Sequence, residues 1–584
     1  MALRFLNKTP FHLVLIALLG LLAYSNTFDV PFQWDDKYLI EQNPIIKDLN
    51  YFSEPSRAEG LEGFEALKGR YIGYLTFALN YKLHGLDVRG YHIVNILIHI
   101  INSLLVYFLV VLTFRTPYLN NPSFLNNPLI ALFSALLFVS HPIQTEAVTY
   151  IFQRLASLCA FFYLLSLLLY IKSRLTEDRA EKYVFYALSL LSAVFAMKTK
   201  ENAFTLPLVI TLYELFFFKG PVTKRMLGLV PLLLTMLIIP LTLIGINKPV
   251  GEVISGINPS LGYEGIERWD YLLTQFRVIV TYIRLLFLPI NQNIDYDYPI
   301  FHSFFTPEVF LSFLFLLSVF GSALYLFYRS KFKPDLRLIS FGVFWFFITL
   351  SVESSIIPIP MVINEYRVYL PSAGAFWALV TGIALFYERK KSGKIWLVIA
   401  LCLTIFILAY AAYSRNNLWG RRVTLWEDVV GHSPKKHRVH FNLAQAYGSE
   451  GMPDKAIEHF QIAINLNPHY EEAHSCLGAV YLSRGLPDKA IGHLELAVKQ
   501  KPEDAEAHYY LANAYYRKGI TDKAVEHYLR VISIEPEHDS ARFNLALIYL
   551  QSGDTGKSRE EFEAVLRINP AHPQAKRFLD YIQN

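Results

Sequence analysis

Two adjacent carboxylates, Asp35 and Asp36, lie in the stretch Phe-Gln-Trp-Asp-Asp at residues 32–36, a few residues after an apolar run. A carboxylate in such a place can take the proton from an attacking hydroxyl, or it can hold a divalent cation. The flanking Phe32 and Trp34 suit a loop that lowers into the mouth of an apolar bundle. Taken alone, the pair is more typical of a solvated turn, so its meaning depends on which polar groups share its side of the membrane.

A second polar group opens another predicted loop with the sequence His-Pro-Ile-Gln-Thr-Glu at 141–146. His141 and Glu146 are candidates for an acceptor site or a second acidic site. Arg154 follows within the next apolar run, and an arginine inside a membrane is costly unless it is paired or lines a polar cavity. The alternative reading is a structural ion pair between Glu146 and Arg154.

Further cations are candidates for binding a phosphate group. Lys198 and Lys200 interrupt two apolar runs, and Arg367 begins another in the stretch Glu-Tyr-Arg at 365–367. Arg277 and Arg284 are seven residues apart and therefore share one helical face. Each of these residues is also compatible with plain surface polarity, or with an arginine that extends along apolar surface to reach water.

The elements that position these residues are predicted to be membrane helices. The chain has 584 residues, of which 53% are hydrophobic and 18% charged. Residues 1–414 are mostly long apolar runs, whereas 415–584 carry dense charge, so an all-α chain with a membrane part and a water-exposed part is expected. About eleven spans are predicted, at 9–27, 90–114, 128–140, 148–171, 183–197, 202–218, 227–246, 308–328, 338–356, 368–387 and 395–413.

The distribution of basic residues predicts the topology. Five basic clusters all fall on the cytoplasmic side if the N-terminus is cytoplasmic and segment 271–289 lies flat at the outer interface instead of spanning. The clusters are Arg4/Lys8, Lys172/Arg174/Arg179/Lys182, Lys219/Lys224/Arg225, Arg329/Lys331/Lys333/Arg337 and Arg389/Lys390/Lys391/Lys394. Loop 28–89, with Asp35 and Asp36, then faces outward together with His141, Glu146, Lys198, Lys200 and everything after residue 413.

A 34-residue period marks the C-terminal part as a repeat array. It relates Gly451, Gly485, Gly519 and Gly553, and likewise Pro468, Pro502, Pro536 and Pro570. This is the tetratricopeptide pattern, a stack of helical hairpins whose default role is to bind polypeptides. Four repeats are predicted at 437–572, preceded by an amphipathic connector at 415–436 and followed by a capping helix at 573–584.

Composition also excludes some classes of protein. The three cysteines are dispersed, which argues against a disulfide framework or a clustered zinc site. No basic stretch is interleaved with aromatic residues on the water-exposed part, so nucleic acid is not an expected partner. The apolar run after Lys8 has no small-residue cleavage site and is better read as an uncleaved first span than as a signal peptide.

Several motifs in order resemble one family. They are WDD at 34–36 with Asn43-Pro44, GYHIVNILIHIINSLLVY at 90–107, LLFVSHPIQTEAVTYIFQRLASL at 136–158, KTKENAFTLPLVITLYE at 198–214, DYDYP at 295–299, NEYRVYLP at 364–371 and RNNLW at 415–419. With the repeats, they make the chain similar to the transmembrane and tetratricopeptide repeat-containing (TMTC) family. Its members are O-mannosyltransferases of the GT-C membrane fold, and the chain resembles the bacterial relatives among them.

The resemblance implies an inverting transfer of one sugar from a polyprenyl-phosphate donor to a hydroxyl, with Ser or Thr of a polypeptide as the expected acceptor. The reaction is expected on the outer (periplasmic or lumenal) side of the membrane, which for a bacterial protein is the inner membrane. Asp35 and Asp36 would then carry the acceptor chemistry, with the choice between them open, and His141, Glu146 and Arg154 nearby. No resident cofactor is implied, and a divalent cation stays an open possibility.

Two other classes compete with this hypothesis. A membrane-anchored repeat scaffold for envelope or pilus assembly would need the repeats but not the outer polar residues. A lipid or sugar carrier would need charges near mid-membrane and internal symmetry, which the sequence does not display.

Overall fold

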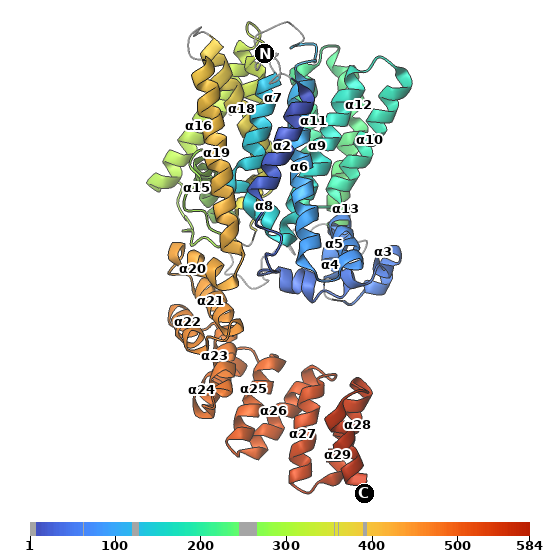
Figure 1. Ribbon diagram of the computed structural model, residues 1–584, viewed down its shortest axis with the longest axis vertical. Helices are drawn as coiled ribbons and strands as arrows, with labels where there is room; N and C mark the ends of the chain where they lie inside the picture. Colours follow the sequence, from blue (N-terminus) through green and yellow to red (C-terminus); the bar gives the residue numbers. More distant parts are fainter. Residues whose placement is uncertain are drawn as a thin grey trace. The chain divides into compact units, whose positions relative to one another are not determined.

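The computed structural model describes residues 8–61, 63–119, 128–244, 266–355, 357–359, 361–388 and 394–583. Arg4, Arg389, Lys390 and Lys391 of the predicted cytoplasmic clusters lie outside these ranges. Within them every regular element is helical (Figure 1), as the sequence predicted. The chain divides into two compact units, Met1–Arg421 and Arg422–Asn584.

The first unit contains the apolar helices. Its α-helices are α2 (Thr9–Ala23), α3 (Asn50–Ser53), α4 (Phe64–Gly69), α5 (Tyr71–His84), α6 (Val88–Thr113), α7 (Pro128–Ser140), α8 (Thr145–Thr149), α9 (Arg154–Leu175), α10 (Arg179–Met197), α11 (Leu206–Phe217), α12 (Val222–Leu234), α13 (Ile238–Ile244), α15 (Arg268–Phe287), α16 (Pro307–Arg329), α17 (Leu336–Leu350), α18 (Tyr369–Glu388) and α19 (Lys394–Trp419).

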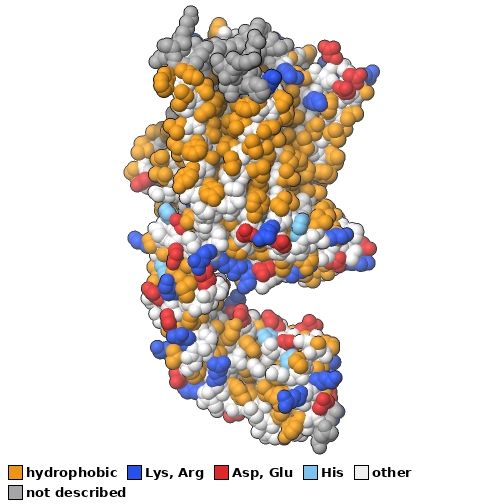
Figure 2. All heavy atoms as spheres, viewed as in Figure 1, with side chains coloured by type: hydrophobic (Ala, Val, Ile, Leu, Met, Phe, Trp, Pro, Cys, Tyr) orange, Lys and Arg blue, Asp and Glu red, His pale blue; other side chains and the backbone are white. Residues whose placement is uncertain are grey.

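Seven helical segments in the described part of the chain are long and apolar enough to cross a membrane. An eighth is added if α7 and the bent segment Pro142–Thr149 count as one span, and α2 and α17 are shorter apolar helices. The predicted total of eleven therefore stays a prediction. Helix α15, which was predicted to lie at the interface, is not among the seven. On the visible face of this unit, hydrophobic side chains form a broad band (Figure 2), as lipid contact requires.

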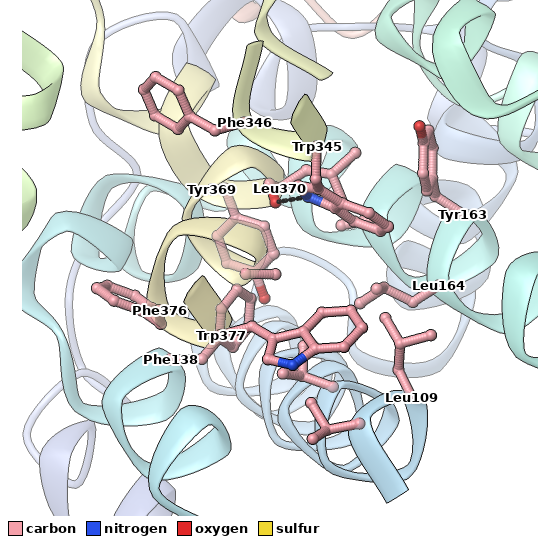
Figure 3. Close-up of a cluster of buried hydrophobic side chains, with 14 of the residues drawn as sticks. Leu109, Phe138, Tyr163, Leu164, Trp345, Phe346, Tyr369, Leu370, Phe376 and Trp377 are labelled. Carbon is pink, nitrogen blue, oxygen red and sulfur yellow. Dashed lines mark hydrogen bonds between the residues drawn. The ribbon is translucent and has the colours of Figure 1, made fainter. Parts of the chain in front are cut away.

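The core of the first unit is built on α7, α17 and α18. Trp345 of α17 donates its indole N–H to the Leu370 carbonyl at 2.9 Å, and Phe138, Tyr369 and Trp377 pack around the same point (Figure 3). This contact ties α17 to the first turn of α18. The residues just before α18, Glu365 to Val368, are thereby held in place.

The loops that the sequence placed on the outer side meet at one end of this bundle. The Ile72 N–H donates to the Lys198 carbonyl at 3.0 Å, and the Gln292 amide donates to the Pro142 carbonyl at 3.2 Å. These bonds link loop 28–89 to loop 198–201, and loop 141–147 to loop 288–299. Their common end agrees with the prediction that the candidate residues share one side.

The second unit is a stack of helical hairpins. Its helices are α20 (Arg422–His432), α21 (His437–Ser449), α22 (Pro453–Leu466), α23 (Glu471–Ser483), α24 (Pro487–Gln500), α25 (Ala505–Arg517), α26 (Thr521–Ile534), α27 (Asp539–Gln551), α28 (Thr555–Ile568) and α29 (Pro573–Gln583). Hairpins α21–α22, α23–α24, α25–α26 and α27–α28 are the four repeats, and the glycine between the helices of each has φ between 73° and 82°. That left-handed conformation explains why glycine recurs there.

The last repeat is closed by a helix of different character. Phe578 of α29 stacks on Phe562 of α28 with ring centroids 5.5 Å apart. Ser558, which stands where the other repeats have alanine, is buried and donates its hydroxyl to the Ala546 carbonyl at 2.9 Å. The serine therefore fits the seam without leaving a polar group unsatisfied.

Candidate active site

Asp36 anchors the first loop to the start of α9. One carboxylate oxygen accepts the Gln33 N–H at 3.0 Å, and the other accepts the Phe152 N–H at 2.8 Å. The side chain is 1% exposed. Burial raises the pKa of Asp36 to about 8, against the lowering effect of the two amides and of the Arg154 charge. Both oxygens are thus committed to the protein's own backbone.

Asp35 is placed differently, because it is only half-buried. Its backbone N–H donates to the Tyr150 hydroxyl at 3.1 Å. The Tyr150 side chain is buried, and its phenol interacts with the Asp35 side chain as well as with the Asp35 backbone.

Aromatic rings fix the shape of this loop. Trp34 stacks on Tyr150 with an interplanar angle of 8°, and Tyr150 in turn stacks on Trp419 at 5.6 Å. Trp34 has a φ of 46°, a left-handed conformation that is rare for a bulky residue and persists only where packing imposes it. Directly after Asp36, Lys37–Glu41 forms a π-helical turn, an irregularity found frequently at functional sites.

Arg154 is fully buried and satisfied by neutral groups. It donates to the Asn95 side-chain oxygen at 2.6 Å, to the Tyr91 carbonyl at 3.0 Å and to the Thr76 carbonyl at 3.3 Å. Its guanidinium also lies 4.6 Å from the Phe77 ring centre. It is therefore held between α5, α6 and α9, where its charge reaches Asp36 but its hydrogen-bond donors face the protein.

His141 and Glu146 are both buried and both hold loops together. His141 accepts the Ile143 N–H on Nδ1 at 3.1 Å and donates from Nε2 to the Leu286 carbonyl at 3.1 Å. Glu146 accepts the Tyr366 N–H at 2.9 Å. The alternative reading of the sequence was a structural ion pair between Glu146 and Arg154. The structure does not have this pair, because the two side chains have separate partners.

Glu365, next to the residue that Glu146 contacts, gathers donors from the loop after α15. It accepts the Asn293 N–H at 2.7 Å, the Gln292 amide at 2.6 Å and the Tyr296 hydroxyl at 2.7 Å. Arg415 of α19 approaches it at 3.5 Å. This buried carboxylate joins its own segment to the loop after α15 and to α19.

Lys200 and Arg367 are engaged in a further buried network. Lys200 pairs with Glu353 at 2.8 Å and lies over the Tyr366 ring, 4.3 Å from its centre. Burial lowers the pKa of Lys200, but Glu353 and Tyr366 together leave it above the ordinary value. Arg367 donates to the Met361 and Val362 carbonyls at 2.8 and 3.2 Å. Neither cation is directed at open space.

Lys198, by contrast, lines a cavity of about 510 Å³. Its ammonium donates to the Thr242 hydroxyl at 2.8 Å, and burial lowers its pKa. Lys68 and Tyr71 contribute to the same cavity. The neighbouring Glu201 is held by Arg70 in a two-point ion pair, at 2.9 and 3.1 Å, and is not available to neutralise an incoming anion.

Arg277 and Arg284 lie on one face of α15, as the sequence predicted from their spacing. Both are half-buried and act electrostatically on Tyr298, whose hydroxyl contacts Thr281 between them at 2.9 Å. Arg284 donates to the Ile290 carbonyl at 3.0 Å. Among the contacts that the described residues make, neither arginine has a carboxylate partner.

An apolar groove of about 380 Å³ adjoins the same helix. Ile283, Leu286 and Phe287 of α15 form one wall, and the other walls come from α16, α17 and α18. The remaining lining residues are Phe315, Val319, Ile339, Val343, Phe346, Phe347, Ala375, Ala378 and Leu379. The volume is within the range of small-molecule sites, and the lining has the character of a lipid chain's surroundings.

Carboxylates elsewhere in the described ranges do not gather into a metal site. No group of three or more His, Cys, Asp or Glu side chains there is arranged to hold an ion. These residues therefore provide no set of ligands for the divalent cation that the sequence left as an open possibility.

Several residues of this site were not among the sequence candidates. Tyr150, Glu353 and Arg70 were not singled out, although Glu353 is the one charged residue inside the predicted span 338–356. A lone charge in an apolar run is a signal of a buried partner. Tyr150 and Arg70 carry no comparable signal, because their roles depend on contacts more than 100 residues away in sequence.

Comparison with known proteins adds two findings. Tetratricopeptide repeat models match residues 437–470, 477–536 and 539–572. The crystal structure of MamA matches 25% of this chain and 86% of its own length, with 26% identity and a TM-score of 0.25.

Among curated proteins, the chain is 26% identical to protein O-mannosyl-transferase F38B6.6 of Caenorhabditis elegans, over 78% of this chain and 63% of that protein. It is 25% identical to human protein O-mannosyl-transferase TMTC1, over 77% of this chain and 54% of that protein. The chain thus spans between half and two thirds of the relatives that it matches along most of its length. It is related in sequence to proteins named protein O-mannosyl-transferase, in agreement with the resemblance in its motifs.

Proposed function

We propose that this chain, as a relative of proteins named protein O-mannosyl-transferase, is a membrane glycosyltransferase that moves one sugar from a polyprenyl-phosphate donor to a Ser or Thr hydroxyl of a polypeptide. Mannose is the sugar that the relatives' names suggest. The observation that carries the proposal is the half-buried Asp35 on a loop that Asp36 fixes to the membrane helices. A carboxylate that is rigidly placed but still reachable is what a general base requires.

Of the two aspartates, Asp35 is the proposed base. Both oxygens of Asp36 accept backbone N–H groups, so a proton from a substrate would have to compete with those bonds. Asp36 is assigned a positioning role. Tyr150 holds Asp35 in place, because its hydroxyl accepts the Asp35 backbone N–H and its ring stacks on the neighbouring Trp34.

In the proposed step, the acceptor hydroxyl oxygen attacks the anomeric carbon of the donor. The bond from that carbon to the phosphate oxygen breaks as the new one forms, so the configuration inverts. Asp35 takes the hydroxyl proton, and the bonding electrons leave with the polyprenyl phosphate. A general base of this kind raises the rate of the chemical step about 10²–10⁴-fold.

The leaving phosphate needs cations that are not already neutralised. Arg277 and Arg284 fit this need, and Lys198 is a second candidate because it lines a cavity. The groove beside α15 is the proposed path of the polyprenyl chain, since it is apolar and adjoins the helix that carries the two arginines. Arg154, Lys200 and Arg367 are proposed to hold the site's framework instead of the phosphate.

The proposal includes an orientation. The N-terminus is placed in the cytoplasm, and the candidate loops and repeats on the outer side, from the positive-inside bias of the basic clusters. The repeats would hold the acceptor polypeptide, which is the usual role of such arrays.

The test is sugar transfer by the purified full chain in lipid nanodiscs, with polyprenyl-phosphate mannose and a threonine peptide. Asp35→Asn is expected to lower kcat at least about 100-fold. Asp29→Asn is the matched control, because Asp29 belongs to the same loop but is exposed and forms a surface ion pair with Arg89. A wild-type rate for Asp35→Asn would rule out Asp35 as the base, and wild-type rates for Asp35→Asn and Asp36→Asn alike would rule out both aspartates.

A further inference from the structure

The repeat unit contains a partly buried histidine pair in each of its first three hairpins. His440 meets His459 with Nδ1 atoms 3.0 Å apart, and His474 meets His493 at 3.1 Å. His508 and His527 form the third pair at 2.9 Å. In each pair one histidine comes from the first helix and one from the second, so the pair bridges the seam of its hairpin.

The hydrogen bonds define where the protons lie. In each pair the first histidine is buried and its Nε2 donates to a proline carbonyl, that of Pro434, Pro468 or Pro502, at 2.9, 3.2 and 3.1 Å. A neutral imidazole with its proton on Nε2 has a bare Nδ1. The second histidine therefore donates its Nδ1 proton to the first, and the contact exists because only one proton lies between the rings.

The surroundings of the pairs repeat as well. Tyr447, Tyr481 and Tyr515 stack on the second histidine, and a lysine, Lys455, Lys489 or Lys523, lies over each tyrosine ring. The other charged groups that act on the pairs are Glu427, Glu458, Glu495, Glu503, Asp504, Glu526 and Arg530. Among all of these residue types, histidine is the one that ordinarily changes charge between pH 5 and 8.

The fourth repeat provides a natural comparison. At the positions equivalent to the pairs it has Arg542 and Glu561, joined by an ion pair at 2.7 Å. Arg542 donates from Nε to the Pro536 carbonyl at 2.9 Å, in the place of the histidine Nε2. The same bridge is thus made once with an arginine and a glutamate, which ordinarily keep their charges between pH 5 and 8, and three times with histidines, which ordinarily do not.

We propose that the three histidine pairs make the repeat unit sensitive to acid, so that its first three hairpins loosen below neutral pH while the fourth does not. A first added proton can enter at the outer nitrogen of the second histidine and leave the contact intact. A second proton places two N–H groups against each other across about 3 Å, and the hairpin seam must open. The inference concerns residues 437–534 alone and does not depend on the proposed sugar transfer.

The direction of the effect follows from proton counting. Burial lowers the pKa of His474 and His508, and burial together with the facing histidine lowers those of His459, His493 and His527. Folded-state values below the ordinary one mean stability that is present above about pH 6.5 and lost as the pH falls further. The unfolded chain takes two protons per pair and the closed pair at most one. Three pairs would then lower the folding equilibrium constant on the order of a thousandfold per pH unit.

Hydrogen exchange measured by mass spectrometry on the full chain in nanodiscs tests the proposal. Rates are corrected for the intrinsic effect of pH, and amide protection is compared at pH 7.5 and 5.0. Protection in α21–α26 is expected to fall at least about tenfold, and that in α27–α28 clearly less. Unchanged protection in α21–α26, or an equal fall in all four hairpins, would overturn the proposal.

A variant that copies the fourth repeat sharpens the test. His508→Arg with His527→Glu should make α25–α26 resistant to acid while α21–α24 still respond. If this variant responds to acid as the wild type does, the third pair is not the sensor. If it fails to fold, the comparison of hairpins within the wild-type chain still decides the outcome.

Discussion

Neighbouring residues of the same type have different structural environments in this protein. Asp36 is 1% exposed and accepts two backbone N–H groups, while Asp35 stays within reach of solvent. From sequence the two aspartates were interchangeable, because the distinction comes from the Phe152 amide, 116 residues away. Lys198 and Lys200 differ in the same manner, one lining a cavity and the other paired with Glu353.

The Lys200–Glu353 pair yields a prediction at this scale. Both side chains are less than 10% exposed, so Lys200→Met leaves a buried carboxylate without its partner. The free energy of unfolding, measured by denaturant titration in mixed micelles, should fall by about 3–5 kcal/mol. The double variant with Glu353→Met should recover most of this loss, since removing both charges also removes their desolvation.

The exposed pair of Arg89 with Asp29 is the control for that experiment, and Asp29→Asn should leave the free energy of unfolding unchanged within error. A double variant no more stable than Lys200→Met alone would contradict the prediction. It would mean that Lys200 acts through contacts other than Glu353.

Among the elements, the crossing of α17 and α18 depends on glycine. A Cβ at Gly374 would lie 2.5 Å from the Trp345 ring and 2.7 Å from the Gly342 carbonyl oxygen. Membrane helices approach this closely only through small residues. Gly374→Ala should therefore lower the free energy of unfolding by about 1–3 kcal/mol.

Gly382→Ala, in the same helix, is the matched control. The nearest atom to its added Cβ is on Ile339 at 3.8 Å, an ordinary contact, so this change should be neutral or stabilising. Equal losses from the two substitutions in the same denaturant titration would show that the crossing is not the cause.

The elements themselves were largely predictable. Apolar runs predicted a helix for each span: the ends of 128–140 coincide with those of α7, and the other spans differ from their helices at one or both ends. The 34-residue period predicted the repeats with their glycine turns. These signals are local, so a single sequence contains them. Segment 202–218 shows the limit, because its helix α11 begins only at Leu206, after a 3₁₀ turn at Glu201–Thr205.

The candidate site was predictable only in outline. Sequence indicated that the polar loops share one end of the bundle, which their mutual contacts agree with. It did not indicate that Arg154 would bond to Asn95, or that Glu365 would collect the loop at 292–296. The pairing of donors with acceptors depends on tertiary packing between distant segments. The hydrophobic pattern of a single sequence does not predict that pairing.

At the scale of the whole chain, two units with separate cores divide the proposed function between them. The core of Met1–Arg421 includes Trp345 and Trp377, and hairpins α21–α28 with α29 bury their own seams. The proposed chemistry depends on residues of the first unit only. In this proposal the repeat unit contributes a surface for polypeptides and, through its histidines, a response to pH.

That division predicts how a variant ending at Arg421 will behave. With its core complete, the shortened chain should transfer sugar to a short threonine peptide at the wild-type kcat. With a long unstructured Ser/Thr-rich polypeptide, its KM should rise at least about tenfold, since the gain from a second tethered binding surface is lost. Radiolabelled donor and both acceptors, assayed side by side with the full chain, give the comparison. An equal loss with both acceptors would mean that the repeats support the membrane unit itself, and no loss with either would remove acceptor binding from their role.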